Sequence, residues 1–256
     1  MILNFITCSG TNEFTDIREL VALMQEYPLG EIGVQVSEKQ SPKGGARIEW
    51  IRELNAYLAE HNIAINAALH INRSWVESLC RGIVVPDLHE LLELRDIYGL
   101  PMFMRLQLNF KLGRDDVHED CDDTLVELQH NIKRRFILSC NKSNERIVRS
   151  LYLKGLRFDC LYDSSFGAGI APDSRQAPMF SDILQGYAGG ISPQSVCSEL
   201  GKISRATDNS ATSGNIYIDA QKGLEDEQTH LSLEKCRTYL AYATRWYRNY
   251  RWGVDL

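Results

Sequence analysis

The alternation of short apolar runs with longer amphipathic stretches most constrains how this chain can fold. The stretch 16–27 shows the pattern, because Ile17, Leu20, Val21 and Met24 recur at helical spacing after an apolar run. Runs that are mostly apolar, rather than alternating, indicate strands of a parallel sheet that is covered on both faces. Eight such runs are found at 2–7, 31–36, 63–71, 102–108, 135–140, 158–163, 185–189 and 215–220.

Helices are expected between these runs. Gly155 suits a helix C-terminus, and Ser192 with Pro193 suits a helix start. The helical stretches are 16–27, 47–60, 73–81, 87–98, 124–132, 144–153, a short helix at 180–185, one that starts at 192–193, and 231–250.

Strands that alternate with helices predict an α/β fold, and eight strands predict a closed (β/α)8 TIM barrel. An open doubly wound sheet is the rival, but the first run is not followed by a G-x-G-x-x-G fingerprint. Chains of 256 residues commonly form one such barrel. We therefore expect a single domain over 1–256, with insertions at about 73–100 and 109–123.

Composition excludes several classes of function. A net charge of −6 argues against nucleic acid as a partner. No apolar run reaches the length of a membrane span, and no signal peptide is apparent at residue 1, so we expect no membrane partner. Seven dispersed cysteines without a C-x-x-C pair indicate neither disulfides nor a zinc ribbon, and they favour a reducing cytoplasm. The sequence leaves the oligomeric state open.

In a (β/α)8 barrel the reacting groups lie at the carboxyl ends of the strands. Cys8 and Asp163 follow strands in this way and could act as a base and an acid across one cavity. A buried structural cysteine and a loop-capping aspartate are the alternative. The other residues at strand ends are Gln35, His70, Gln107, Cys140, Gly189 with Gly190, and Asp219.

Glycines near the last two strands indicate a phosphate site. Gly189, Gly190 and Gly223 allow the backbone N–H groups to approach an anion closely. Lys43 and Arg47, in the loop after the second strand, could bind a phosphate or carboxylate, or could belong to a solvated turn. We expect no metal, because the acidic segment 115–123 with His118 lacks calcium-binding spacing, and we expect His70 at the rim.

Several short motifs, in order along the chain, resemble phosphoribosylanthranilate isomerases, the barrel enzymes of tryptophan biosynthesis. The family's K-I-C-G resembles residues 6–9, its G-F-V-F and P-K-S-P-R resemble 33–36 and 41–43, and its Q-L-H-G resembles 107–110. Its L-L-D-S and G-G-T-G resemble 161–164 and 167–169, its L-A-G-G-L-x-P-x-N-V resembles 187–196, and its D-V-S-S-G-V-E resembles 219–225.

The resemblance implies an isomerase without cofactor that converts an aminoaldose phosphate to an aminoketose phosphate by an Amadori rearrangement. It implies Cys8 as general base and Asp163 as general acid. Differences at Ser9, Lys43 and Ala168 indicate a divergent member whose substrate can differ. The residues expected to bind the phosphorylated sugar are Lys43, Arg47, Gln107, Gly167, Gly169, Gly189, Gly190, Asp219, Lys222 and Gly223.

Two other functions remain open at the sequence level. A Schiff-base aldolase or lyase on the same barrel would use Lys111 or Lys222, although both lysines lie beyond their strands. A protein that binds a phosphorylated sugar without turnover would keep the phosphate site alone. Fold analogy favours all three functions and proves none of them.

Overall fold

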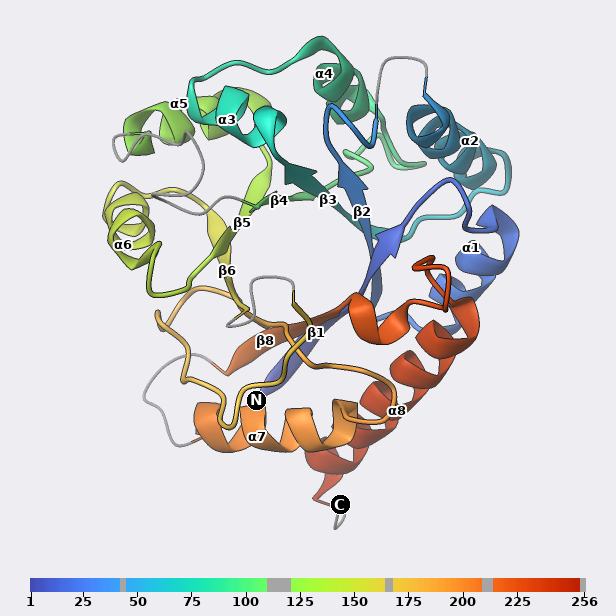
Figure 1. Cartoon of the computed structure of the whole chain (residues 1–256), viewed down its shortest axis with the longest axis vertical. Helices are drawn as coiled ribbons and strands as arrows, with labels where there is room; N and C mark the ends of the chain where they lie inside the picture. The colour runs from blue at the N-terminus through green and yellow to red at the C-terminus, as the bar shows by residue number, and fades with distance from the viewer. Residues whose placement is uncertain (42–44, 110–120, 164–167, 209–213, 254–256) are drawn as a thin grey trace. The chain divides into compact units, whose positions relative to one another are not determined.

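The strands form one closed parallel barrel in this computed structural model, which describes residues 1–41, 45–109, 121–163, 168–208 and 214–253. Within these residues, eight strands follow one another round the barrel in chain order, and Figure 1 shows them as an inner ring with helices outside. The predicted (β/α)8 fold is thereby confirmed. The strands are β1 (Ile2–Thr11), β2 (Gly30–Val36), β3 (Asn66–Asn72), β4 (Arg105–Asn109), β5 (Arg135–Ser139), β6 (Phe158–Tyr162), β7 (Gln185–Tyr187) and β8 (Asn215–Ala220).

Helices connect most of these strands. Capping explains two of the helix starts, because the side chains of Asp16 and Ser232 accept hydrogen bonds from the backbone N–H groups of Glu19 and Lys235. The helices are α1 (Ile17–Glu26), α2 (Ala46–Glu60), α3 (Ser74–Cys80), α4 (Pro86–Glu93), α5 (Asp122–Ile132), α6 (Glu145–Leu153), α7 (Val196–Asp208) and α8 (Leu233–Trp252), with a 3₁₀ turn η1 (Lys222–Leu224).

The chain divides into two compact units, Met1–Ile32 with Tyr162–Leu256, and Gly33–Leu161. In the first unit β1 pairs with β8, in a register that runs from Ile2 opposite Asn215 to Cys8 opposite Ala220. Figure 1 shows this pairing as a blue strand beside a red one. The long helix α8 packs against β1 and buries Tyr239, Leu240 and Ala243 completely.

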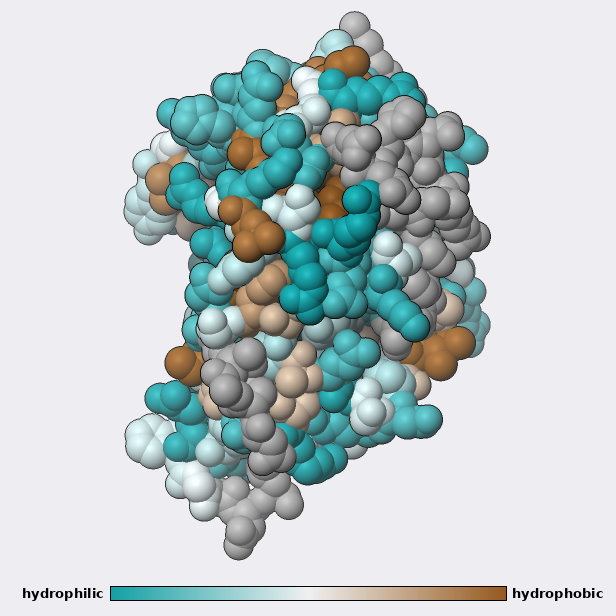
Figure 2. Space-filling model, turned by 90° about the vertical axis from the view of Figure 1, so that its left-hand side faces the viewer, coloured by the Kyte–Doolittle hydropathy of each residue, from teal (hydrophilic) through white to brown (hydrophobic). Residues whose placement is uncertain are grey.

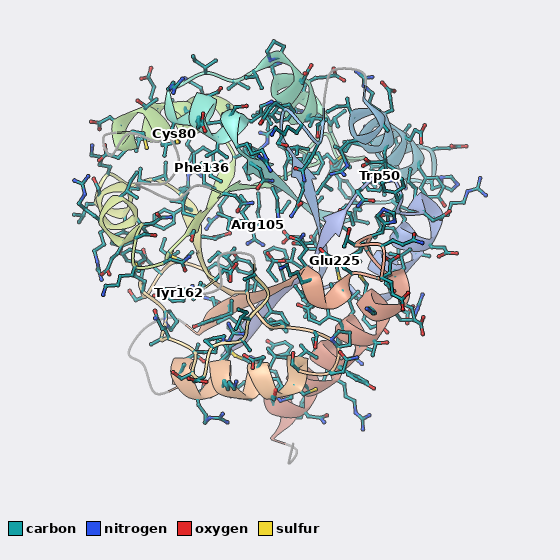
Figure 3. All side chains as sticks on the ribbon, viewed as in Figure 1. Trp50, Cys80, Arg105, Phe136, Tyr162 and Glu225 are labelled. Atoms are coloured by element: carbon teal, nitrogen blue, oxygen red, sulfur yellow. The ribbon has the colours of Figure 1, made fainter. Side chains whose placement is uncertain are left out.

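In the second unit β3, β4, β5 and β6 pair in sequence. Successive side chains of a strand point to opposite faces, so each of these strands has two distinct sides. On the side that faces the helices the residues are apolar and fully buried, such as Leu106, Phe136 and Phe158. The barrel-lining side carries buried polar residues as well as apolar ones, and Figure 3 shows one of the polar residues, Arg105, inside the ring of strands.

Several predicted boundaries were wrong. β3 begins at Asn66 rather than at 63, and α4 ends at Glu93 rather than at 98. The Asp96 carboxylate ends the helical pattern, because it accepts hydrogen bonds from the N–H groups of Tyr98 and Leu100. Residues 180–185 form no helix, and α7 begins at Val196 after a turn at 193–195.

Both predicted insertions can be placed only in part. The first, 73–100, contains α3 and α4. The second, 109–123, lies mostly outside the described residues, although Asp122 and Asp123 begin α5 and form ion pairs with Lys154.

No helix in the described ranges is long and apolar enough to cross a lipid bilayer. The face of the molecule in Figure 2 is largely hydrophilic, with hydrophobic side chains in small separate patches.

Candidate functional site

The turn after β7 presents two backbone N–H groups in one direction. Gly189 and Gly190 have φ values of +80° and +68°, which glycine adopts without strain. The guanidinium of Arg175 donates to the carbonyl oxygens of Ala188 at 2.6 Å and Gly189 at 2.8 Å. In a trans peptide the N–H points opposite to the C=O, so the N–H groups of Gly189 and Gly190 both point away from Arg175. Aligned N–H groups of this kind form an anion-binding concavity.

Arg175 is held in place by a buried ion pair. Its Nε lies 2.8 Å and its Nη2 2.6 Å from Oε2 of Glu199 on α7. Arg175 and Glu199 are 8% and 2% exposed, so the pair is shielded from solvent. The other oxygen of Glu199 accepts from Lys202 at 2.8 Å. Both carboxylate oxygens of Glu199 are therefore paired with a cation, and the ion pair holds the guanidinium of Arg175 in one orientation.

The glycines predicted to bind phosphate lie beside this turn. A Cβ on Gly223 would lie 2.4 Å from the Ile191 carbonyl oxygen, so the backbone of η1 approaches the turn closely. A Cβ on Gly169 would lie 2.9 Å from the side chain of Lys222. The structure therefore brings Gly169, Gly189, Gly190, Lys222 and Gly223 together within the first unit.

The side chain of Lys222 is exposed and forms a hydrogen bond beside this cluster. Its Nζ donates to the backbone carbonyl oxygen of Ala168 at 3.2 Å, in an exposed position. A Schiff-base lysine is usually activated in an apolar pocket or beside another cation. Lys222 therefore fits an anion contact better than it fits an aldolase nucleophile. The other candidate lysine, Lys111, lies outside the described residues.

Carboxylates and hydroxyls lie on the barrel-lining side of β1, β2 and β8. Ser9 donates to Oδ1 of Asp219 at 2.5 Å, and Thr7 donates to Oε2 of Glu31 at 2.8 Å. All four side chains are buried, with Asp219 7% and Glu31 1% exposed. Asp219, in β8, stands three residues before Lys222 in the chain, so this carboxylate lies close to the cluster of glycines around Lys222.

Cys8 lies on the other side of β1. It is fully buried, and its thiol forms a side-chain hydrogen bond with the thiol of Cys236 on α8. That hydrogen bond, burial, and the negative charge of Asp219 raise the pKa of Cys8 well above its usual value. The thiol therefore faces the helices and stays protonated. The role of Cys8 as a base remains a prediction, and its surroundings do not favour it.

Asp163 directly follows β6 and is partly exposed. It belongs to the first unit, as do Asp219 and the glycine cluster. This position at a strand end is compatible with the acid role that the resemblance implies, although no contact of Asp163 decides it. Gly167 and Lys43, which we also expected in the site, lie outside the described residues.

Two further predicted site residues belong to the second unit. Arg47, 7% exposed, donates to the carbonyl oxygen of Gln35 at 2.6 Å. Gln107 donates to Asn109 at 2.7 Å, and Asn109 donates to Asn72 at 2.9 Å. These contacts order the polar side of β2, β3 and β4 but leave their part in ligand binding untested.

His70 is buried rather than placed at the rim, which corrects the prediction. It is 2% exposed and lies opposite Gln107 in the register of β3 and β4. Burial, helped by the charge of Arg105, lowers the pKa of His70 to about 3. Arg105 in turn pairs with Asp159 at 3.0 Å, and Asp159 also accepts from Arg135 at 2.9 Å. Among the described residues, no cluster of side chains could hold a metal ion.

Sequence analysis missed Ser9, Glu31 and Arg175. Alternation along 5–9 could have found Ser9, because Phe5, Thr7 and Ser9 share one side of the strand. Arg175 gives no comparable signal. It lies in a loop, and its partner Glu199 is 24 residues away in the chain.

Comparison with known proteins supports the fold. No protein-family model matches the chain, and no curated protein matches it. Among solved structures it is similar to phosphoribosyl anthranilate isomerase from Thermotoga maritima, with a TM-score of 0.52 and 15% identity over 95% of this chain and 100% of that chain. It is also similar to TrpF from Jonesia denitrificans, with a TM-score of 0.51 and 14% identity over 94% and 96% of the two chains.

A third similar structure carries a different name. The spore coat polysaccharide biosynthesis protein spsE from Bacillus subtilis has a TM-score of 0.52 and 11% identity over 99% of this chain and 71% of that chain. At such identities the likeness establishes the barrel and leaves the activity open.

Proposed function

We propose that the chain is an isomerase of a phosphorylated sugar, which converts an aminoaldose phosphate to an aminoketose phosphate by general acid–base catalysis. The observation that carries this proposal is the pair of aligned N–H groups at Gly189 and Gly190, fixed by Arg175. The two similar structures named as phosphoribosyl anthranilate isomerase and TrpF have this type of barrel.

The phosphate is bound by backbone groups in this proposal. The N–H groups of Gly189 and Gly190 donate to its oxygens, and the backbone of Gly223 allows it to approach. Lys222 supplies a positive charge from the same cluster. Because the N–H groups are already oriented, little ordering cost opposes binding.

Two proton transfers complete the rearrangement. An acid protonates the ring oxygen as the furanose opens, and a base removes the proton on C2 to give an enolamine that tautomerises to the ketone. We keep Asp163 as the acid. For the base we favour Asp219, positioned by the hydrogen bond from Ser9, because it lines the barrel beside the phosphate cluster while Cys8 faces α8.

The assay generates phosphoribosylanthranilate in situ and follows the decay of its fluorescence. We expect turnover by the wild type, and a kcat about 10²-fold lower for Asp163→Asn and for Asp219→Asn, as is typical when a general acid or base is removed. Cys8→Ala, with native circular dichroism, is the matched control and should keep its turnover. A folded Cys8→Ala protein without activity would return the base role to the thiol.

A protein that binds a phosphorylated sugar without turnover is the second candidate. It is favoured by one observation, since the thiol that the resemblance makes the base faces the helices. Inorganic phosphate that raises the melting temperature of the wild type, but not of Arg175→Met, would support the phosphate site. The same result without turnover of any aldose phosphate tested would favour the binding protein over the isomerase.

A further inference from the structure

Two buried polar side chains lie opposite each other on β3 and β4. His70 and Gln107 are partners in the parallel register of these strands, and neighbouring strands lie about 4.8 Å apart. Both lie on the barrel-lining side, since Leu106 next to Gln107 faces the helices, and they are 2% and 7% exposed. Nε2 of His70 and Oε1 of Gln107 are buried without a hydrogen-bond partner among the described residues. Buried polar atoms are usually paired, so these two atoms on adjacent strands indicate a ligand group.

A chain of amides fixes which atom of Gln107 is left over. Asn72 donates from its Nδ2 to the backbone carbonyl oxygen of His70 at 3.0 Å, and that oxygen can only accept. The Oδ1 of Asn72 therefore accepts from Nδ2 of Asn109 at 2.9 Å. The Oδ1 of Asn109 in turn accepts from Nε2 of Gln107 at 2.7 Å. Reversing one amide would place two donors or two acceptors face to face, so the remaining atom of Gln107 is an acceptor.

Cations outnumber anions near this pair. Arg105 lies two residues before Gln107 on the same side of β4, inside the ring of strands in Figure 3. Its ion partner Asp159, at 3.0 Å, also pairs with Arg135 at 2.9 Å. Burial, helped by the charge of Arg105, lowers the pKa of His70 to about 3, so the imidazole is neutral at pH 7. The same surroundings oppose a cationic ligand there.

The two atoms select the chemistry of a ligand. An ionised carboxylate or phosphate offers only acceptors, which would face the acceptor of Gln107. An ammonium group offers donors, but the excess of positive charge opposes it. A hydroxyl is neutral, and it can both donate to Gln107 and accept from a neutral histidine. Ile137 lies opposite Gln107 on β5 and is buried, so an apolar side chain is available to the carbon that carries the hydroxyl.

We propose that His70 and Gln107 form a binding site for a hydroxyl group of a sugar. The hydroxyl donates to Oε1 of Gln107 and accepts from Nε2–H of His70, so binding selects the tautomer with its proton on Nε2. The hydroxyl class follows from the two side chains, whereas the choice of a sugar rests on the proposed function. Both residues belong to the second unit, so the site is complete within that unit. They stand two residues before Asn72 and Asn109, which end β3 and β4 at the side where barrels of this type bind ligands.

The test follows the imidazole of His70 by NMR. Protein with isotopically labelled histidine is titrated at pH 7 with D-ribose and, separately, with D-ribose 5-phosphate, and long-range proton–nitrogen correlation spectra report each ring nitrogen. The signals of His70 are assigned as those lost in His70→Asn. We expect a protonated Nε2 and saturable shifts of the His70 nitrogens with either sugar. Inorganic phosphate and acetate, at matched ionic strength, should leave these signals unchanged.

Two outcomes would overturn the proposal. Unchanged His70 signals up to the solubility limit of ribose would mean that His70 and Gln107 bind only water. An equal shift with inorganic phosphate or acetate would mean that an anion, and not a hydroxyl, occupies the site. Neither result depends on turnover. Isomerase activity with unchanged His70 signals would refute this site and keep the proposed function, whereas His70 shifts in a protein without isomerase activity would keep this site alone.

Variants of Gln107 separate hydroxyl binding from a general loss of structure. Gln107→Leu removes the acceptor, and ribose should then bind about tenfold more weakly, because the bound hydroxyl is left without its partner. Gln129→Leu is the matched control, since Gln129 on α5 is similarly buried but pairs with the backbone of Arg157, and it should keep the ribose response of His70. Where Gln107→Leu lacks native circular dichroism, Gln107→Met, of similar length, takes its place. Wild-type affinity in the folded variant would contradict the proposal.

Discussion

At the scale of single residues, His70 places a neutral imidazole inside a polar barrel. Its Nε2 is buried without a hydrogen-bond partner among the described residues, and Arg105 lies near enough to repel a positive charge. The folded protein therefore resists protonation of His70 down to a pKa of about 3. The unfolded chain takes up the same proton at a pKa of about 6.5.

This difference predicts a specific acid sensitivity. Between pH 6.5 and 3 the unfolded state binds more protons than the folded one, so stability falls by about 1.4 kcal/mol for each unit that the pH falls. Urea unfolding at pH 7.0, 5.5 and 4.5 should show a shallower decline for His70→Asn than for the wild type. His61→Asn, on the exposed end of α2, serves as the control and should follow the wild type. Parallel curves for all three proteins would contradict the prediction.

The residue scale also shows which neighbours at the candidate site follow from the sequence. Glycines after β7 and in η1 were predicted and do lie together, because strand-end position in a parallel barrel already determines their neighbourhood. The side on which Cys8 points could not be predicted from the motif alone. It depends on the two-residue period of β1, in which Cys8 shares the helix side with Ile6 and not the lining side with Ser9.

At the scale of elements, the β7–α7 turn combines an unusual backbone with tight packing. Gly190 has a positive φ, and a Cβ added to it would lie 2.3 Å from the backbone of Ala171. The loop that carries Arg175 therefore lies directly on the turn. Ser195 reinforces the arrangement, because its hydroxyl donates to the Gly190 carbonyl oxygen at 2.8 Å.

Gly190→Ala should be costly for two separable reasons. The left-handed backbone alone costs about 1 kcal/mol for alanine, and the clash with Ala171 raises the loss to about 3 kcal/mol. Gly99→Ala isolates the first cost, since Gly99 has a φ of +74° and open space around it. Urea unfolding of the two variants should show the larger loss at Gly190. Equal losses would mean that the loop over the turn yields easily.

The positions of strands and helices were predictable where apolar residues recur at a regular, short spacing in the sequence. The eight strands were expected within a few residues because apolar runs mark them, whereas the ends of α4 and α7 were not. Asp96 accepts hydrogen bonds from two N–H groups of a turn beyond α4, and the Ser192 hydroxyl accepts from the N–H of Ser195 in the manner of an N-cap, so these ends depend on local side-chain contacts. The expected helix at 180–185 is instead a loop that buries Phe180.

At the scale of the whole molecule, closure of the barrel depends on its last strand. β8 pairs with β7 and with β1, and α8 packs against β1 from outside. A chain that ends at Gly214 lacks β8, η1 and α8, and it leaves one edge of β1 without its partner. An open edge and a missing apolar layer favour aggregation over folding.

Truncation therefore tests the closure. We expect the protein ending at Gly214 to be largely insoluble or to melt without a cooperative transition, as followed by circular dichroism. The control ends at Gly253 and retains every described strand and helix, so it should melt like the full chain. A soluble, cooperatively melting protein of residues 1–214 would show that the barrel does not need β8.

The pairing of β1 with β8 also determines how long β1 lacks its partner strand during synthesis. Residue 11 completes β1, but its partner strand is complete only at residue 220. At about 5–20 residues per second, a ribosome takes roughly 10–40 seconds to make the chain between them. Throughout that interval the edge of β1 that pairs with β8 has no partner. A newly made copy of this barrel therefore exposes an unpaired strand edge for longer than a protein whose neighbouring strands are also neighbours in the chain.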